Sequence, residues 1–192
     1  LFAGDGSGVY EVTQTMQALR RSGIDVKNVT AEHPDASFDR LPPGDYGVVV
    51  QAQGQIVAVL SHYDRTDGVA SGEAGTPGPG ATQGAVAEGQ IGLNSAQEIV
   101  GVLNANAQAA TVLFSFLFQN GTAYRTSLTV PGESRGSLDV SSLANFPVGQ
   151  PYSVFFESDV PVSMTLPTQV FGDEFATSFS DRAYTLWGFG EG

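Results

Sequence analysis

One short sequence phrase occurs three times in this 192-residue chain. Each copy is an apolar run of β-strand type followed by a carboxylate and a glycine, and the copies lie at residues 1–6, 85–89 and 187–192. Two longer stretches, 46–56 and 152–162, resemble each other and precede the second and third copies. Such recurrence is the signature of repeated structural modules. We therefore expect a duplicated module of roughly 90 to 100 residues, with a boundary near Gln90.

The second half of the chain has the alternating pattern of an all-β protein. Apolar side chains occupy both faces of the segment 111–118, which indicates a strand in the centre of a sheet. Asn120-Gly121 follows, and this dipeptide is the strongest local signal for a type I′ hairpin turn. The return segment 124–130 then alternates apolar and polar residues. Further strands are predicted at 99–103, 138–140, 152–157, 162–166, 175–179 and 184–189. Strands and turns at this spacing predict an antiparallel, immunoglobulin-like β-sandwich over residues 91–192.

The first half has a weaker pattern, which we interpret as a diverged copy of the same sandwich over residues 1–90. Strands are predicted at 9–13, 24–30, 46–52 and 55–62, and one or two helical turns at 14–21. Residues 68–84 are rich in glycine and proline. Alone, this stretch would read as a linker between domains. The alignment of the repeats instead places it inside the first module, where we predict a long surface loop. The predicted fold is thus all-β, with two tandem modules.

Charge and composition limit the partners and the location of the protein. The net charge is −12, and a surface this negative repels nucleic acid and anionic membranes. The longest apolar run, near 112–118, is far shorter than the ~20 residues that cross a bilayer. Only 15% of residues are charged, so uncharged polar side chains must cover much of the surface. This composition is typical of exported β proteins, and we expect an extracellular or cell-surface location. The absence of cysteine does not fix the compartment.

Three acidic or glycine-rich segments could bind a ligand. Gly4-Asp5-Gly6-Ser7-Gly8 resembles a phosphate-binding loop, but such a loop needs a following helix and a lysine, so we predict a turn. Residues 64–68 with Glu73, and separately Asp173-Glu174, offer oxygen ligands for Ca²⁺. They lack the spacing of an EF-hand loop, and we interpret them as acidic turns while leaving Ca²⁺ binding open.

The histidines and the tryptophan give little support for catalysis or sugar binding. His33 and His62 are the only histidines, and the chain has neither a cysteine nor a serine in a nucleophile-elbow motif. We therefore expect both to be structural or surface residues. The single tryptophan, Trp187, is weak evidence for a carbohydrate-binding face. We assign no catalytic, cofactor-binding or metal-binding residue and expect no cofactor and no enzymatic activity.

Several short motifs of the second half carry a resemblance to a known class of module. They are Leu103–Asn106, Ala110–Val112, Asn120–Thr122, Val130–Arg135, Glu157–Asp159, Pro161-Val162 and Trp187–Gly192. In these residues the chain resembles the tandem immunoglobulin-like β-sandwich repeats of large bacterial secreted and cell-surface proteins, whose copies end in an aromatic-Ala-Glu-Gly phrase. Gly4 and Gly190 depart from that phrase. The resemblance implies an extracellular structural or adhesive module and transfers no active-site residue and no ligand.

These observations favour a non-catalytic structural or adhesive module of a surface layer, stalk, filament or adhesin. Its expected partners are other copies of itself or components of the cell envelope. Two alternatives are a carbohydrate-binding accessory module and a decoration protein of a viral capsid or tail. Because the recurring phrase stands at Leu1, we also expect a processed chain or a fragment of a longer one.

Overall fold

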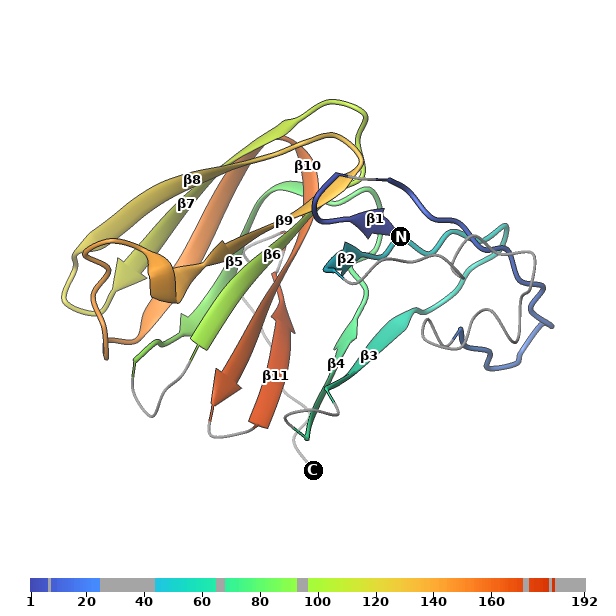
Figure 1. Ribbon diagram of the computed structural model, residues 1–192, viewed down its shortest axis with the longest axis horizontal. Coiled ribbons are helices and arrows are strands. Elements are labelled where there is room, and N and C mark those ends of the chain that lie inside the picture. Colours follow the sequence, from blue (N-terminus) through green and yellow to red (C-terminus); the bar gives the residue numbers. More distant parts are fainter. Residues whose placement is uncertain are drawn as a thin grey trace.

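The protein is an all-β chain built from antiparallel strands (Figure 1). The structure, a computed structural model, describes residues 1–6, 8–24, 44–64, 68–92, 97–170, 173–179 and 181. These ranges contain no α-helix, and their one short 3-10 helix is η2 (Val140–Ser142). The strands are β1 (Phe2–Ala3), β2 (Tyr46–Gly47), β3 (Val59–Asp64), β4 (Val69–Ala74), β5 (Ala81–Gly89), β6 (Gln97–Asn104), β7 (Ala110–Phe118), β8 (Ala123–Val130), β9 (Ser134–Asp139), β10 (Tyr152–Val170) and β11 (Asp173–Ser178).

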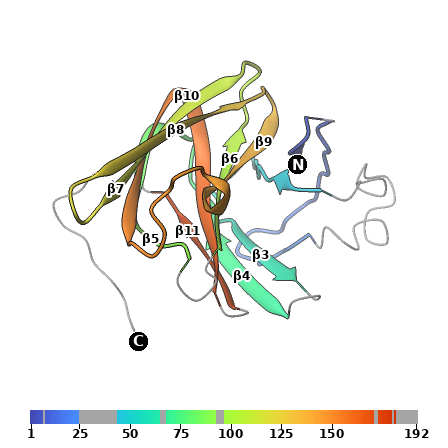
Figure 2. The same cartoon turned by 60° about the vertical axis from the view of Figure 1, so that its left-hand side comes forward.

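The long strand β10 organises a seven-stranded, nearly closed sheet. Its first half pairs with β7 on one side and with β5 on the other. Its second half pairs with β6 and with β11. Strands β8 and β9 extend the sheet beyond β7 and β6, and they contact each other. The result is a barrel-like sandwich whose two halves share one strand (Figures 1 and 2).

Strand β10 changes partners at a short irregular segment. Its ladder with β7 ends at Ser158, and its ladder with β6 begins at Ser163. Between them, Pro161 has no N–H to donate to a neighbouring strand. The carboxylate of Asp159 accepts a hydrogen bond from the backbone N–H of Thr111 at 2.7 Å. Side-chain bonding therefore replaces the ladder where the strand crosses from one half to the other.

Asn104 and Asn106 fasten this crossover to two loops, and we call the pair the Asn104 node. The Asn104 side chain is fully buried. Its Nδ2 donates to the carbonyls of Gln108, Val130 and Pro131 at 2.8, 3.2 and 3.0 Å. The Asn106 side chain donates to Asn104 Oδ1 at 2.9 Å and to the Pro161 carbonyl at 2.7 Å. Backbone carbonyls of three separate segments thus receive partners from two amide side chains.

The core fills the space between the two halves of the sheet. The inward side chains of β7, from Ala110 to Phe118, are at most 5% exposed. At one end, Phe116, Phe146 and Tyr152 pack edge to face, with ring centroids 5.0 to 5.4 Å apart. Edge-to-face contacts of this kind add about 0.5–1.5 kcal/mol each beyond the burial of area.

A buried carboxylate lies beside this aromatic cluster. Glu98 is 2% exposed and accepts hydrogen bonds from the Gln90 backbone N–H (2.7 Å), from Thr168 Oγ1 (3.3 Å) and from the hydroxyl of Tyr152. All three partners are donors, so the arrangement suits the ionised carboxylate. A Cβ atom at Gly89 would overlap the Tyr152 ring. The glycine that closes the second copy of the recurring phrase is therefore required by packing.

The N-terminal part packs against the outside of this sandwich. The β1–β2 ribbon lies against β9, and the β3–β4 hairpin lies beside β11 (Figures 1 and 2). Gly47 in β2 leaves room for the Leu103 side chain on the outer face of β6, because a Cβ at Gly47 would approach Leu103 Cδ1 within 2.5 Å. Most of the N-terminal part therefore lies outside the core.

The all-β prediction is confirmed, whereas the two-module arrangement is not. Strand β5 pairs with β10, so the expected boundary near Gln90 falls between two strands of one sheet. The predicted surface loop at 68–84 is wrong: it contains β4 and the start of β5, with a turn between them. Glycine-rich composition hid both strands, of which β4 pairs with the neighbouring strand β3 and β5 pairs with the distant strand β10.

Other local predictions met mixed outcomes. The predicted strands 152–157 and 162–166 are parts of the single strand β10. Residues 9–13 form only an isolated bridge at Val9, and 14–21 form no helix. Strand β2 ends at Gly47, and β3 begins at Val59 and pairs with β4. Residues 25–30 and 184–189, with the third phrase, lie outside the described residues.

The β7–β8 hairpin is confirmed, but its turn type differs from the prediction. A type I′ turn needs positive φ at both Asn120 and Gly121. Gly121 has a φ of 82°, whereas Asn120 is not among the residues with positive φ. The Gly121 N–H donates to the Phe118 carbonyl at 3.0 Å. This is the three-residue loop that joins a type I turn to a left-handed glycine.

Replacing Asn104 with alanine should destabilise the fold much more than the same change at Asn120. The three carbonyls bonded by the buried Asn104 side chain would lose their donor, which we expect to lower the free energy of unfolding by about 2–4 kcal/mol. The Asn120 side chain is exposed, and its loss should cost no more than about 1 kcal/mol. Urea unfolding of both variants measures the difference, and equal losses would contradict a structural role for the Asn104 node.

Tyr152 should make the fold sensitive to alkaline pH. Burial, followed by the hydrogen bond to Glu98, raises the pKa of Tyr152 well above its ordinary value of 10.0. The folded state therefore holds this proton more tightly than the unfolded state does. The stabilisation is fully present below about pH 10 and is lost as the pH rises further. In urea unfolding at increasing pH, Tyr152→Phe should be less stable at neutral pH by about 1–3 kcal/mol but show a smaller alkaline loss. Parallel pH curves for the two proteins would overturn this assignment.

Candidate functional site

A pocket of the described structure lies where the N-terminal ribbon meets the sandwich. It has a volume of about 340 Å³. Segments distant in the sequence form it: the turn after β1, the residues leading into β2, and strand β9. Its lining residues are Ala3, Gly4, Asp5, Gly44, Asp45, Tyr46, Arg135 and Ser137. The volume is at the lower end of the roughly 300–1,000 Å³ that is typical of ligand pockets.

Backbone contacts fix the two N-terminal walls of the pocket. Ala3 pairs with Tyr46 in the β1–β2 ribbon, and the Gly4 N–H donates to the Asp45 carbonyl at 2.8 Å. A Cβ at Gly4 would lie 3.1 Å from that carbonyl oxygen, so a side chain there would crowd the contact. The Gly6 N–H donates to the Ala3 carbonyl at 3.2 Å. The turn predicted at 4–8 is therefore present at Gly4–Gly6, with Ser7 outside the described residues.

Arg135 is the basic residue of the pocket. It pairs with Leu103 across β9 and β6, and its side chain is only 18% exposed. The guanidinium Nη1 lies 2.9 Å from Asp45 Oδ2, and the Asp45 side chain is 72% exposed. Gly101 leaves room beside the guanidinium, because a Cβ there would lie 3.4 Å from Nη2. The ion pair thus links the core strand β9 to the N-terminal ribbon.

A second carboxylate acts on Arg135 from strand β4. The Oε2 atom of Glu73 is buried and has no hydrogen-bond partner. Burial raises the pKa of the Glu73 carboxyl, and the positive charge of Arg135 opposes this effect. The charge of Arg135 therefore acts on acidic groups of two separate N-terminal elements.

Tyr46 provides an aromatic wall. Its ring packs edge to face on Tyr10, with centroids 6.0 Å apart. Burial raises the pKa of Tyr46, and the neighbouring Tyr10 and Asp5 add to this effect. The Tyr46 hydroxyl is therefore protonated at neutral pH and can both donate and accept a hydrogen bond. With Ser137, Asp45 and Arg135, the pocket offers donors and acceptors in a small volume, and its lining contains no histidine.

The acidic segments predicted from the sequence do not come together in the described structure. Asp64 ends β3, Glu73 lies in β4, and residues 65–67 are outside the described ranges. Asp173 and Glu174 begin β11. Within the described ranges, no group of three or more His, Cys, Asp or Glu residues could hold a metal ion.

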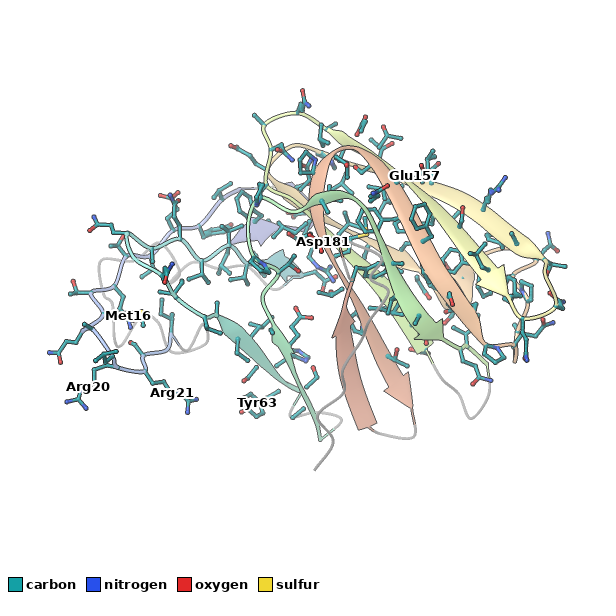
Figure 3. The ribbon with its side chains drawn as sticks, turned by 180° about the vertical axis from the view of Figure 1, so that it is seen from behind. Met16, Arg20, Arg21, Tyr63, Glu157 and Asp181 are labelled. Atoms are coloured by element: carbon teal, nitrogen blue, oxygen red, sulfur yellow. The ribbon has the colours of Figure 1, made fainter. Side chains whose placement is uncertain are left out.

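The remaining candidates are also dispersed. His62 is exposed on β3, whereas His33 and Trp187 lie outside the described residues. Arg20 and Arg21 lie at the end of the N-terminal segment far from the sandwich (Figure 3). Sequence reasoning missed the pocket around Arg135. The signal that could have found it is Arg135 itself. This residue ends the motif Val130–Arg135 and is one of only eight basic residues in a chain with 20 acidic residues.

No helix in the described part of the chain has both the length and the apolar character needed to cross a membrane.

Comparisons with known proteins leave the family open. No family model and no curated protein sequence matches the chain. A solved structure of Thermotoga maritima 1070 is similar over 53% of this chain and 94% of its own, with 24% identity and a TM-score of 0.49. The Anabaena sensory rhodopsin transducer is similar over 44% of this chain and 79% of its own, with 27% identity and a TM-score of 0.41. Both scores are below 0.5, so neither likeness carries an argument about function.

Glu73→Gln should remove part of the pH dependence of stability. Because burial raises the Glu73 pKa above its ordinary value of 4.5, the folded state favours the protonated form. That contribution is present below pH 4.5 and is lost as the pH rises through the folded-state pKa. Thermal melts between about pH 4 and pH 7 should therefore show the variant gaining stability relative to the wild type as the pH rises. Glu157→Gln, at an exposed carboxylate, is the control. A constant difference between Glu73→Gln and wild type across this range would contradict the prediction.

Proposed function

We propose that the protein is a non-catalytic structural or adhesive module of an extracellular assembly, and that it works by contact with other copies of itself. The observation that carries this proposal is a neutral apolar stretch, residues 48–63. This stretch contains no Asp, Glu, Lys or Arg in a chain of net charge −12. A partner that covers this stretch would shield apolar area from water. His62 is the only side chain of the stretch that can carry a charge near neutral pH.

The neutral apolar stretch exposes many large side chains. Val57 is 93% exposed, Val59 67% and Tyr63 70%. Tyr63 points away from the body of the molecule (Figure 3). Further exposed members are Val48, Val49, Val50, Ile56 and Leu60. Large exposed apolar side chains gathered in one stretch of chain support an interaction site here.

Strand β3 supplies an open sheet edge within this stretch. In the described structure β3 pairs with β4 alone, in a two-stranded sheet. A two-stranded hairpin is only marginally stable by itself, and its free edge can accept a further strand. Antiparallel pairing of β3 with β3 of a second copy would form a two-fold symmetric interface.

Charge favours a second copy at this position. Two molecules of net charge −12 repel each other, and the repulsion is smallest where neutral surfaces meet. The neutral apolar stretch therefore provides a surface on which copies can approach closely. The proposed location is extracellular. The low content of charged residues and the resemblance to secreted repeats support it.

Lysines in the neutral apolar stretch should weaken self-association. We expect size-exclusion chromatography with light scattering to show a concentration-dependent dimer of the wild-type chain, which persists at high salt because screening reduces repulsion between the acidic surfaces. The double change Val57→Lys and Val59→Lys should raise the dissociation constant at least about tenfold, which corresponds to about 1.4 kcal/mol.

Val148→Lys is the matched control, because Val148 is also an exposed valine, at 63%, but lies outside this stretch. It should leave the dissociation constant unchanged. A wild-type chain that stays monomeric at all concentrations and salt conditions would refute the proposal, as would an equal effect of the control.

A further inference from the structure

The pocket around Arg135 is lined by residues outside the neutral apolar stretch. We propose that this pocket binds a single neutral sugar ring, held by the Asp45–Arg135 pair and Ser137 against the ring of Tyr46. The inference is independent of self-association, because β9 and the β1–β2 ribbon form the pocket whereas β3 carries the proposed interface.

Charge argues against an anionic ligand. Two carboxylates, Asp5 and Asp45, line the pocket with a single guanidinium. That guanidinium already faces Asp45 at 2.9 Å and acts on Glu73 behind it. The field at the pocket is therefore not positive, and the chain as a whole carries −12. A phosphate, sulfate or carboxylate group would meet repulsion rather than attraction.

Cations and apolar molecules fit the pocket no better. A cation gains little here, because Asp45 is already paired with Arg135 and the guanidinium partly cancels the field of the acidic groups. The described residues also supply no cluster of three metal-ligating side chains. An apolar molecule would cover the charged and hydroxyl groups of the lining without giving them hydrogen-bond partners, which is costly.

A sugar ring satisfies the groups that remain. Its hydroxyls both donate and accept, so they can bond a carboxylate, a guanidinium and a serine hydroxyl together. Arg135 engages Oδ2 of Asp45, which orients the exposed carboxylate while Oδ1 can still accept. The apolar C–H face of a sugar can pack on the Tyr46 ring, whose position is fixed by Tyr10. The volume of about 340 Å³ suits one small ring rather than a long chain.

Saturation-transfer NMR on the full chain tests this inference. The probes are the methyl glycosides of glucose, galactose and mannose, and N-acetylglucosamine, with inorganic phosphate and calcium chloride as competing additions. We expect saturation transfer to at least one neutral sugar, unaffected by phosphate or calcium. Asp45→Asn and Ser137→Ala should each weaken binding about tenfold, as expected for the loss of one good hydrogen bond.

Glu157→Gln is the matched control, because Glu157 is an exposed carboxylate on β10 outside the pocket (Figure 3). It should bind the sugar as the wild type does, and circular dichroism should show all three variants folded. Absence of transfer to every sugar would overturn the inference. Binding unchanged in both pocket variants would also overturn it, because the sugar would then lie elsewhere. Displacement of the sugar by phosphate would show that the pocket selects anions and would reject the neutral ligand.

Discussion

The fold depends on one strand that belongs to both halves of the sandwich. β10 runs for 19 residues and pairs directly with β5, β6, β7 and β11. A strand of this length cannot stay straight and still serve two facing sheets, so it must change direction near its middle. The change falls at residues 158–163, where the ladder is interrupted and side chains of Asp159 and Asn106 supply the hydrogen bonds. The position of every other strand in the sheet follows from this crossover.

The motifs that resemble secreted repeats converge on the same crossover. Hydrogen bonds connect residues of four of these motifs to one another or to neighbouring strands. The residues are Asn104 and Asn106 of one motif, Pro131 of a second, Asp159 of a third and Pro161 of a fourth. These residues act on backbone groups rather than on a ligand. The described contacts of these motifs thus account for part of the fold and point to no reaction.

Elements formed by local interactions could be predicted from the sequence, whereas elements formed by distant ones could not. The β7–β8 hairpin is visible in its alternation and in Asn120-Gly121, although the turn uses a left-handed glycine after a type I turn. The pattern predicts two strands at 152–157 and 162–166, but β10 continues past Pro161, where side-chain hydrogen bonds hold the crossover. Strand β5 was hidden in a glycine-rich stretch because its pairing with β10 is non-local. The Arg135 pocket was missed for the same reason, since its walls come from three distant segments.

Two charged residues show how differently the two parts of the chain are held. Glu98 accepts hydrogen bonds inside the sandwich from Gln90, which follows β5, and from Tyr152 and Thr168, which both lie in β10. Arg135 instead lies on the outer side of the sheet, where an ion pair with an exposed partner attaches the N-terminal ribbon. Exposed ion pairs contribute little stability, typically below about 1 kcal/mol. The N-terminal part is therefore attached in part by polar contacts, while the valines of residues 48–59 are left largely in water. Six phenylalanines of the described ranges are buried, whereas these valines are exposed, so this stretch has apolar surface available for a partner.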